Sequence, residues 1–222
     1  MKNIFSGLLM VAGTYFVFAQ ETRNVGDFNS LKVYDRIPVE LVKSSKSKVE
    51  ITKGNNTDVE VVNKNGELKI RMTPVKKLQG QEAKVVVYYE NLNDIQASQG
   101  STITSDDEVE SSMLKLTSNE GSKITLKVDT DRLDVKGNSG GELKISGKAK
   151  SQDIIISSGA KFNGEDIKSD NATISTNAGG EAAVFASESV RATTRAGGII
   201  NVYGDPDDRN VKKVVGGTIN FK

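Results

Sequence analysis

The sequence predicts an all-β fold whose C-terminal part is a parallel β-solenoid, also called a β-helix. Three observations support this prediction. Pairs of small residues recur at intervals of 18 to 21 residues, and apolar and polar residues alternate on both sides of each pair. The composition combines 21 Gly with only 3 Pro, which suits many tight turns between short strands.

Seven small-residue pairs mark the repeat, with spacings of 21, 19, 19, 20, 18 and 19 residues. Apolar residues precede and follow each pair at fixed offsets; around one pair these are Leu133, Val135, Leu143 and Ile145. Such period-2 alternation indicates half-buried strands. We therefore expect coils of about 19 residues, seven of them regular over 92–222. The first members of the pairs are predicted to be structural corners, because Gly adopts positive φ and permits close backbone approach: Gly100, Gly121, Gly140, Gly159, Gly179, Gly197 and Gly216.

The constant offsets favour stacked coils over a β-sandwich. Sandwich strands also recur regularly, but each occupies a different place in a closed core. Here the same residue classes return in every copy, so stacking would form ladders of Ile, Val and Leu inside the molecule. A third, polar stretch closes each coil and usually carries one apolar residue: Val109, Val128, Ala149, Ile167 and Ala186.

The N-terminal part, about 24–91, is less regular. A solenoid end needs a cap, so this part is either that cap or a set of wider coils. We favour continuity, with 20–222 forming a single β-solenoid domain. The predicted strands are Ser30–Val33, Pro38–Val42, Lys48–Thr52, Asp58–Val62, Glu67–Met72 and Lys84–Glu90.

The first nineteen residues are predicted to be a signal peptide. Lys2 supplies a positive start, an apolar stretch follows from Ile4 to Phe18, and the small residue Ala19 marks the cleavage position. The alternative is a membrane anchor, but about 15 apolar residues are fewer than the roughly 20 that a span requires. No later segment is apolar enough to span a bilayer. The mature protein is therefore expected in the periplasm, outside the cell or at the cell surface.

Composition narrows the function classes. The 30 basic and 29 acidic residues are interspersed, which gives nucleic-acid binding no support. The absence of Cys excludes disulfides, cysteine ligands for zinc and a lipoprotein anchor. The absence of His removes the commonest general base and metal ligand. We predict no cofactor and no catalytic residue.

Three charged segments are candidates for binding metal ions or anionic ligands. Asp205, Asp207 and Asp208 form a weak candidate for calcium or magnesium, but the flanking Tyr-Gly-Asp-Pro sequence indicates a turn first. The acidic run at 106–108 is interpreted as a solvated loop, and the lysine-rich run at 43–48 as a turn. No metal site is therefore predicted.

Enzymes that cleave sugars also use β-helices, and they need paired carboxylates at a fixed separation. One repeat apart, Asp131 aligns with Lys150 and Asp170, which is a mixed set. Rows of Thr would instead form polar ladders on flat outer faces, which suit binding of glycans or surfaces. They also fit ordinary strand composition. These residues include Thr102, Thr104, Thr117, Thr125, Thr173 and Thr193.

A series of segments follows in a specific order along the chain: RNVGDFNSLKV at 23–33, VEL at 39–41, GELKI at 66–70, KVVVY at 84–88, YGDP at 203–206 and GGTI at 216–219. In these segments the mature chain, over about 22–222, resembles the head-GIN family, a domain family described as an autotransporter adhesin head. The resemblance implies a right-handed β-solenoid in the cell envelope or outside the cell. The corners depart slightly from the family pattern, with Asn-Ser-Gly-Gly, Ala-Gly-Gly or Glu-Gly-Ser in place of Ser-Gly.

The predicted function is a non-enzymatic, adhesin-like module that binds a surface or glycan. Its partner would be a cell-surface glycan or an envelope protein. The first alternative is a periplasmic structural or envelope-signalling module, and the second alternative is a carbohydrate-active β-helix enzyme. The sequence leaves the ligand and the oligomeric state open.

Overall fold

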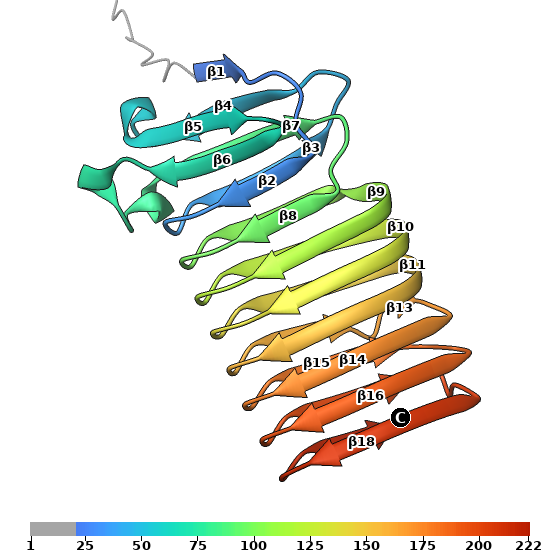
Figure 1. Cartoon of the computed structure of the whole chain (residues 1–222). Coiled ribbons are helices and arrows are strands. Elements are labelled where there is room, and N and C mark those ends of the chain that lie inside the picture. Colours follow the sequence, from blue (N-terminus) through green and yellow to red (C-terminus); the bar gives the residue numbers. More distant parts are fainter. Residues whose placement is uncertain (1–20) are drawn as a thin grey trace, which may run out of the picture.

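The computed structural model describes residues 21–222, and within them the chain is a stack of β-coils (Figure 1). Nineteen strands and three short 3₁₀ helices account for its regular elements. The all-β solenoid predicted from the repeat is confirmed, with parallel coils about 19 residues apart and about seven regular turns. The predicted signal peptide lies outside the described residues.

The regular coils begin at β8. In the first regular coils, a single long, bent strand continues from one face to the next, because its hydrogen bonds to the neighbouring coil are not interrupted. In the later coils, each strand is shorter and lies on a single face. The strands are β8 (Asp94–Ala97), β9 (Thr102–Ser118), β10 (Lys123–Gly137), β11 (Glu142–Ser157), β12 (Lys161–Gly164), β13 (Ile167–Lys168), β14 (Asn171–Asn177), β15 (Glu181–Phe185), β16 (Ser189–Arg195), β17 (Ile199–Tyr203), β18 (Asp208–Val214) and β19 (Thr218–Phe221).

Three faces surround the core. The first face, before each corner, contains β8, the C-terminal parts of β9 to β11, and then β14, β16 and β18. The second face, after each corner, contains the N-terminal parts of β9 to β11, and then β12, β15, β17 and β19. The third face is strand only in the middle of β9 to β11 and in β13. On this face Val128 lies in register with Gly147. The apolar residues Val128 and Ala149 therefore do not lie over one another, because they are offset by two residues.

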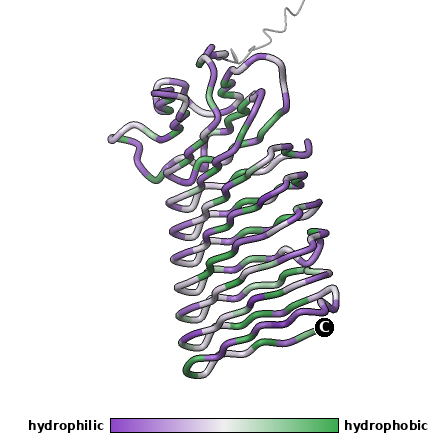
Figure 2. Tube along the Cα trace, turned by 45° about the vertical axis from the view of Figure 1, so that its right-hand side comes forward, coloured by the Kyte–Doolittle hydropathy of each residue, from purple (hydrophilic) through white to green (hydrophobic). Residues whose placement is uncertain are grey.

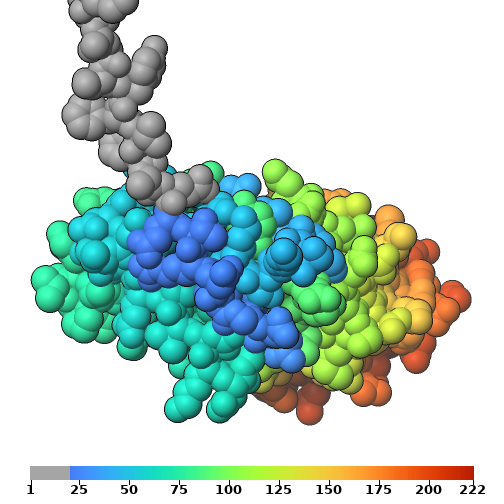
Figure 3. All heavy atoms as spheres, turned by 90° about the horizontal axis from the view of Figure 1, so that it is seen from above, coloured from blue at the N-terminus to red at the C-terminus, as the bar shows by residue number. Residues whose placement is uncertain are grey.

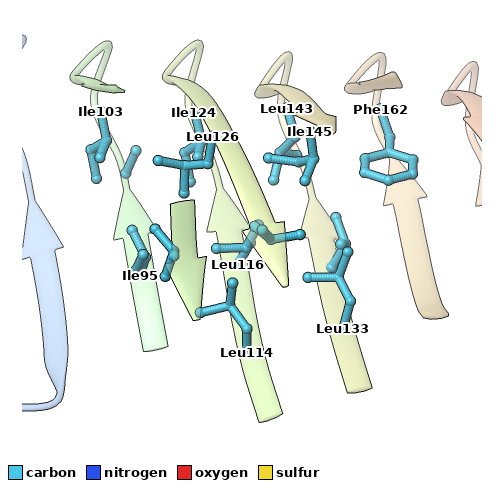
Figure 4. Close-up of a cluster of buried hydrophobic side chains, with 14 of the residues drawn as sticks. Ile95, Ile103, Leu114, Leu116, Ile124, Leu126, Leu133, Leu143, Ile145 and Phe162 are labelled. Atoms are coloured by element: carbon cyan, nitrogen blue, oxygen red, sulfur yellow. The ribbon is translucent and has the colours of Figure 1, made fainter. Parts of the chain in front are cut away.

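The core consists of ladders in which each inward side chain lies over its counterpart in the next coil. On the second face, Ile124 lies between Ile103 and Leu143 in the parallel register (Figure 4). Green and purple alternate along every coil in Figure 2, as the period-2 pattern requires. One buried cluster extends from Phe28 to Ile219. Each fully buried aliphatic side chain contributes about 1.5–3 kcal/mol, so the rod is stabilised along its whole length.

Each corner is a tight turn with two successive residues at positive φ. In the corner at Gly140, φ is 49° at Ser139 and 72° at Gly140, and the amide of Gly141 donates to the carbonyl of Asn138 (3.0 Å). Two positive φ angles closed by this hydrogen bond are typical of a type I′ turn. The Gly140 amide also donates to Ser158 in the next corner (3.1 Å), so the corners themselves form a hydrogen-bonded column.

The two roles expected of the corner glycines are divided between neighbouring positions. A Cβ at Gly140 would meet no heavy atom within 4 Å, so this residue supplies only the positive φ. A Cβ at Gly141 would lie 2.2 Å from the carbonyl oxygen of Ser118. Close approach of the backbone is therefore the requirement at the second position of this pair.

The N-terminal part contains two further coils and several antiparallel strands. Its elements lie close to the strands predicted from the sequence. They are β1 (Glu21–Asn24), β2 (Ser30–Val33), β3 (Pro38–Lys43), β4 (Lys48–Lys53), η1 (Asn56–Asp58), β5 (Val59–Lys64), β6 (Glu67–Met72), η2 (Pro74–Lys76), η3 (Gly80–Glu82) and β7 (Lys84–Tyr89).

Coil order along the rod differs from chain order at this end. β2 pairs in parallel with both β6 and β8, and β3 pairs in parallel with both β7 and β9. The coil β2–β3 therefore lies between coil β6–β7 and the regular coils. Antiparallel pairing of β4 with β7 and β1, and of β5 with β6, covers the outer side. Seen from above, atoms of this part face the viewer (Figure 3). Antiparallel pairs thus occur at the N-terminal end, while the regular coils pair in parallel.

Candidate binding groove

A shallow groove follows the second face of the rod. Its volume is about 600 Å³, and it crosses β10, β11, β12, β15 and β17. Because the coils stack in register, its outward side chains form two straight rows. The first row, here the charged row, contains Lys123, Glu142, Lys161, Glu181 and Ile199. The second row, here the amide row, contains Thr125, Lys144, Asn163, Ala183 and Asn201.

The charged row alternates in sign along the rod. The Nζ of Lys123 lies 2.8 Å from a carboxylate oxygen of Glu142, and that of Lys161 lies 3.3 Å from Glu181. All four side chains are about half exposed, so each pair contributes well under about 1 kcal/mol to stability. The pairs leave this edge of the groove close to electrically neutral, apart from Lys144 on the neighbouring row.

The amide row offers donors and acceptors on short side chains. Asn220 extends this row into the last coil, where its Nδ2 donates to Oδ1 of Asn201 (2.9 Å). Ala183 leaves an open step between the two amides of Asn163 and Asn201, while the Phe162 side chain is buried in the core and only 2% exposed. The groove can therefore exchange hydrogen bonds with a polar ligand through the outward side chains of this row.

A second depression, of about 280 Å³, lies on the first face near the C-terminal end. Its lining is polar, and Ser189 donates a short hydrogen bond of 2.5 Å to Oδ1 of Asn171. It is smaller than the groove and is crossed by fewer coils. Its lining residues are Ser151, Gln152, Asn171, Ala172, Thr173, Ser189, Val190, Arg191, Asp208 and Asn210.

The weak metal candidate is held in the turn before β18. Asp205 forms an ion pair with Arg209, whose Nε also donates to the carbonyl of Pro206 (2.8 Å). Asp208 begins β18. Within residues 21–222, no group of three or more Asp, Glu, His or Cys side chains is placed to hold a metal ion.

The residues considered for sugar cleavage form ion pairs. Lys150 Nζ lies 2.5 Å from Asp131, and hydrogen bonding to that carboxylate, with a smaller contribution from Asp170, raises the pKa of Lys150. In the acidic run, Asp107 accepts the Lys43 amide (2.8 Å) and Glu108 pairs with Lys127 (3.5 Å). Asp131 and Glu108 thus pair with lysines of the chain, and Asp107 accepts a backbone amide.

The lysine-rich run lies between β3 and β4. Lys48 forms an ion pair with Glu50 (2.6 Å), its Nζ lies 4.1 Å from the centre of the Tyr88 ring, and Tyr88 donates to Glu50 (3.0 Å). The run is therefore partly engaged by the protein itself.

The Thr residues chosen from the sequence lie on the outer faces, half-buried or exposed. The structure brings only Thr125 of them to the groove, while Thr173 lines the second depression. Sequence reasoning missed the charged row. A signal for it was present, because Lys123, Glu142, Lys161 and Glu181 alternate in sign at intervals of 19 or 20 residues.

The described residues contain no helix with the length and apolar character of a membrane span.

Comparison with known proteins identifies a domain family with this sequence pattern. The model of the family described as "Putative auto-transporter adhesin, head GIN domain" matches residues 27–206. No curated protein matches the sequence significantly.

Solved structures share the fold at low sequence identity. A "putative adhesin" from Bacteroides fragilis is 18% identical, with a TM-score of 0.85 over 92% of this chain and 96% of that one. A "putative adhesin" from Parabacteroides merdae is also 18% identical, with a TM-score of 0.71 over 92% and 95%. A "putative lipid binding protein" from Parabacteroides distasonis is 16% identical, with a TM-score of 0.73 over 92% and 96%. The family match covers most of the sequence, the solenoid architecture agrees with it, and the resemblance found in the sequence is thereby confirmed: the chain belongs to the head GIN domain family.

Proposed function

We propose that this protein is a non-enzymatic, adhesin-like binding module of the cell envelope or cell exterior. Its groove on the second face binds an extended, uncharged glycan that lies along the rod. The proposal rests chiefly on one observation: two in-register rows, one dominated by Lys–Glu pairs and one carrying Thr125, Asn163 and Asn201, border the groove across five strands.

The chemistry of the amide row suits sugar hydroxyl groups. Each hydroxyl both donates and accepts, and Asn163 and Asn201 carry a donor and an acceptor on one short side chain. The alternating ion pairs of Lys123 with Glu142 and of Lys161 with Glu181 produce no strong field of one sign along the charged row. Only the single charge of Lys144 is left over by these pairs, so a highly charged polymer would gain little here, whereas a neutral one needs no counter-charge.

The stacking of coils suits a repeating ligand. Outward positions recur about every 4.8 Å along the rod, and the Lys–Glu pair of the charged row recurs every second coil, so a polymer lying along the rod meets a repeating pattern. Individually weak contacts then add up, because binding of one unit raises the effective concentration of the next. Affinity is expected to increase with the length of the glycan.

The test is a glycan-array screen with the purified protein and two tryptophan variants. Ala183→Trp fills the open step in the amide row. Ser175→Trp is the control, because Ser175 lies outward on the first face, away from the groove. We expect binding to neutral polysaccharides that falls by at least about tenfold in Ala183→Trp and is unchanged in Ser175→Trp. A uniformly negative array, or equal losses in both variants, would contradict the proposal.

A periplasmic structural or envelope-signalling module is the second candidate. The edges of β18 and β19 that no other strand within 21–222 pairs with favour it, because free strand edges promote assembly with another chain. Screening that finds no glycan but does find assembly through this end would support the second candidate over the first.

A further inference from the structure

The last coil leaves two strand edges free. Among the described residues, β18 pairs only with β16, and β19 pairs only with β17. Figure 1 shows residue 222 in this coil. Unpaired edges present rows of amide and carbonyl groups that can pair with another chain.

Apolar side chains accompany these edges. Val211 is 46% exposed, Val215 82% and Phe221 36%. Val211 lies in register with buried Ala192, and Phe221 with buried Val202. The interior ladders therefore continue into this coil, where no other strand of residues 21–222 lies over them. Arg209 lies across this end with its guanidinium 4.5 Å from the centre of the Phe221 ring, and Asp205 balances its charge.

The charged residues in and just before β18 are arranged so that two antiparallel copies of this segment place opposite charges against each other. Asp207 and Asp208 precede Asn210, and Lys212 and Lys213 follow it. If a second copy pairs antiparallel about Asn210, Asp208 faces Lys212 and Asp207 faces Lys213 on both sides of the two-fold axis. Opposite charges at directly facing positions stabilise an antiparallel pair.

Neighbouring registers lack this match. Pairing centred on Val211 would place Lys213 opposite Arg209, and like charges at facing positions are destabilising. A shift by one residue would turn inward side chains outward. The charge pattern therefore selects one register and one kind of partner.

We infer that the C-terminal end binds a second copy of this chain tail to tail, through antiparallel pairing of β18 about Asn210. Such pairing extends the sheet of the first face across the two-fold axis and covers Val211. It is isologous, so it closes at a dimer and does not continue as a filament. The N-terminal ends of the two copies then lie at the far ends of a rod of doubled length.

A charge-swap experiment tests the inference by sedimentation over a dilution series from about 1 μM to about 1 mM. One variant carries Asp207→Lys and Asp208→Lys, and the other carries Lys212→Asp and Lys213→Asp. We expect the unmodified protein to dimerise, each variant alone to be monomeric, and their equimolar mixture to dimerise again. All four positions are exposed, so the variants should keep the circular dichroism of the parent. Lys136→Asp with Lys46→Asp, at exposed sites away from β18, is the matched control and should still dimerise.

A crosslinking experiment tests the register. The chain has no Cys, so Asn210→Cys places a single thiol on the proposed axis, facing its own symmetry mate at a distance that a disulfide can bridge. Lys212→Cys is the control, because its symmetry mate lies opposite Asp208. We expect rapid oxidative dimerisation of Asn210→Cys and little of Lys212→Cys.

Several results would overturn the inference: a monomer throughout the dilution series, a dimer that survives both charge-reversed variants, a mixture that fails to reassociate, or equal crosslinking at the two positions. Glycan binding at the second face does not enter these measurements, so this inference and the proposed function can fail separately.

Discussion

The two ends of the rod are built differently. At the N-terminal end, the coil β2–β3 is enclosed between β6–β7 and the regular coils, and antiparallel strands cover the outer side. At the C-terminal end, the last coil is held on one side only. Because stability in a solenoid is close to a sum of nearest-neighbour terms, a residue with coils on both sides should matter more than one with a single neighbouring coil.

The largest expected effect compares one aliphatic residue from each end. Leu31 is fully buried between Leu68 and Ile95, so Leu31→Ala should lower the free energy of unfolding by about 3–4 kcal/mol. Ile219 contacts only Ile200 in the ladder and is 7% exposed, so Ile219→Ala should cost about 1–2 kcal/mol because the open end can relax. Urea midpoints measure both, and equal losses would refute the proposed difference between the ends.

The second prediction separates the two glycines of a regular corner. Gly141→Ala should destabilise by about 3 kcal/mol, because its Cβ would overlap the Ser118 carbonyl. Gly140→Ala should cost only about 1 kcal/mol, since space is free and only the positive φ is unfavourable. Thermal unfolding of the two variants checks the order, and a larger loss at Gly140 would contradict it.

The third prediction concerns Tyr89, in the N-terminal part. Its hydroxyl is buried without a hydrogen-bond partner, and burial, reinforced by Asp107 and Glu110, raises its pKa from 10.0 to about 12. The folded state therefore holds this proton more tightly than the unfolded state. Below pH 10 the hydroxyl keeps its proton in both states, so stability does not vary with pH through this group. Between about pH 10 and 12 the unfolded state loses the proton first, so the free energy of unfolding falls, by up to about 2 kcal/mol.

Tyr89→Phe removes this titration. Its unfolding free energy should equal or slightly exceed that of the parent at pH 7, and it should fall less steeply above pH 10. Comparing the two proteins at each pH cancels the titration of lysines common to both. Parallel pH curves would show that the Tyr89 hydroxyl does not carry the effect.

The smallest expected effect tests the corner between β2 and β3. Asp35 and Arg36 have φ of 58° and 63° there, where regular corners have Gly at the second place. Arg36→Gly should stabilise the protein by about 0.5 kcal/mol, because relief of the backbone conformation exceeds the added freedom of the unfolded chain. A measurable destabilisation would mean that the Arg36 side chain makes a contact worth more than the strain.

The regular coils could be predicted from the sequence because each corner repeats a small-residue pair and each strand repeats its inward positions. The corner at Asp35 could not, because Arg36 gives no glycine signal. Tertiary contacts hold it instead: the amide of Gly80 donates to the Asp35 carbonyl (3.1 Å), and the Asp35 carboxylate accepts the amide of Met72 (3.1 Å).

Two further features lay beyond the sequence pattern. The enclosure of β2 between β6 and β8 joins segments distant in the chain, and strand periodicity says nothing about which strands pair. The groove depends on how the outward rows lie side by side after stacking. The candidate Thr residues were chosen for type alone, which is why only Thr125 lies at the groove.

The enclosed coil has a consequence for synthesis. As the polypeptide emerges N-terminus first, β2 has neither neighbour until residues 67–72 and 94–97 have followed. Long-range closure of this kind is slow. Every later stretch of about 19 residues finds a completed template as soon as it appears, so assembly should begin with one delayed nucleation event near the amino terminus and then advance quickly, one turn after another, toward the other end.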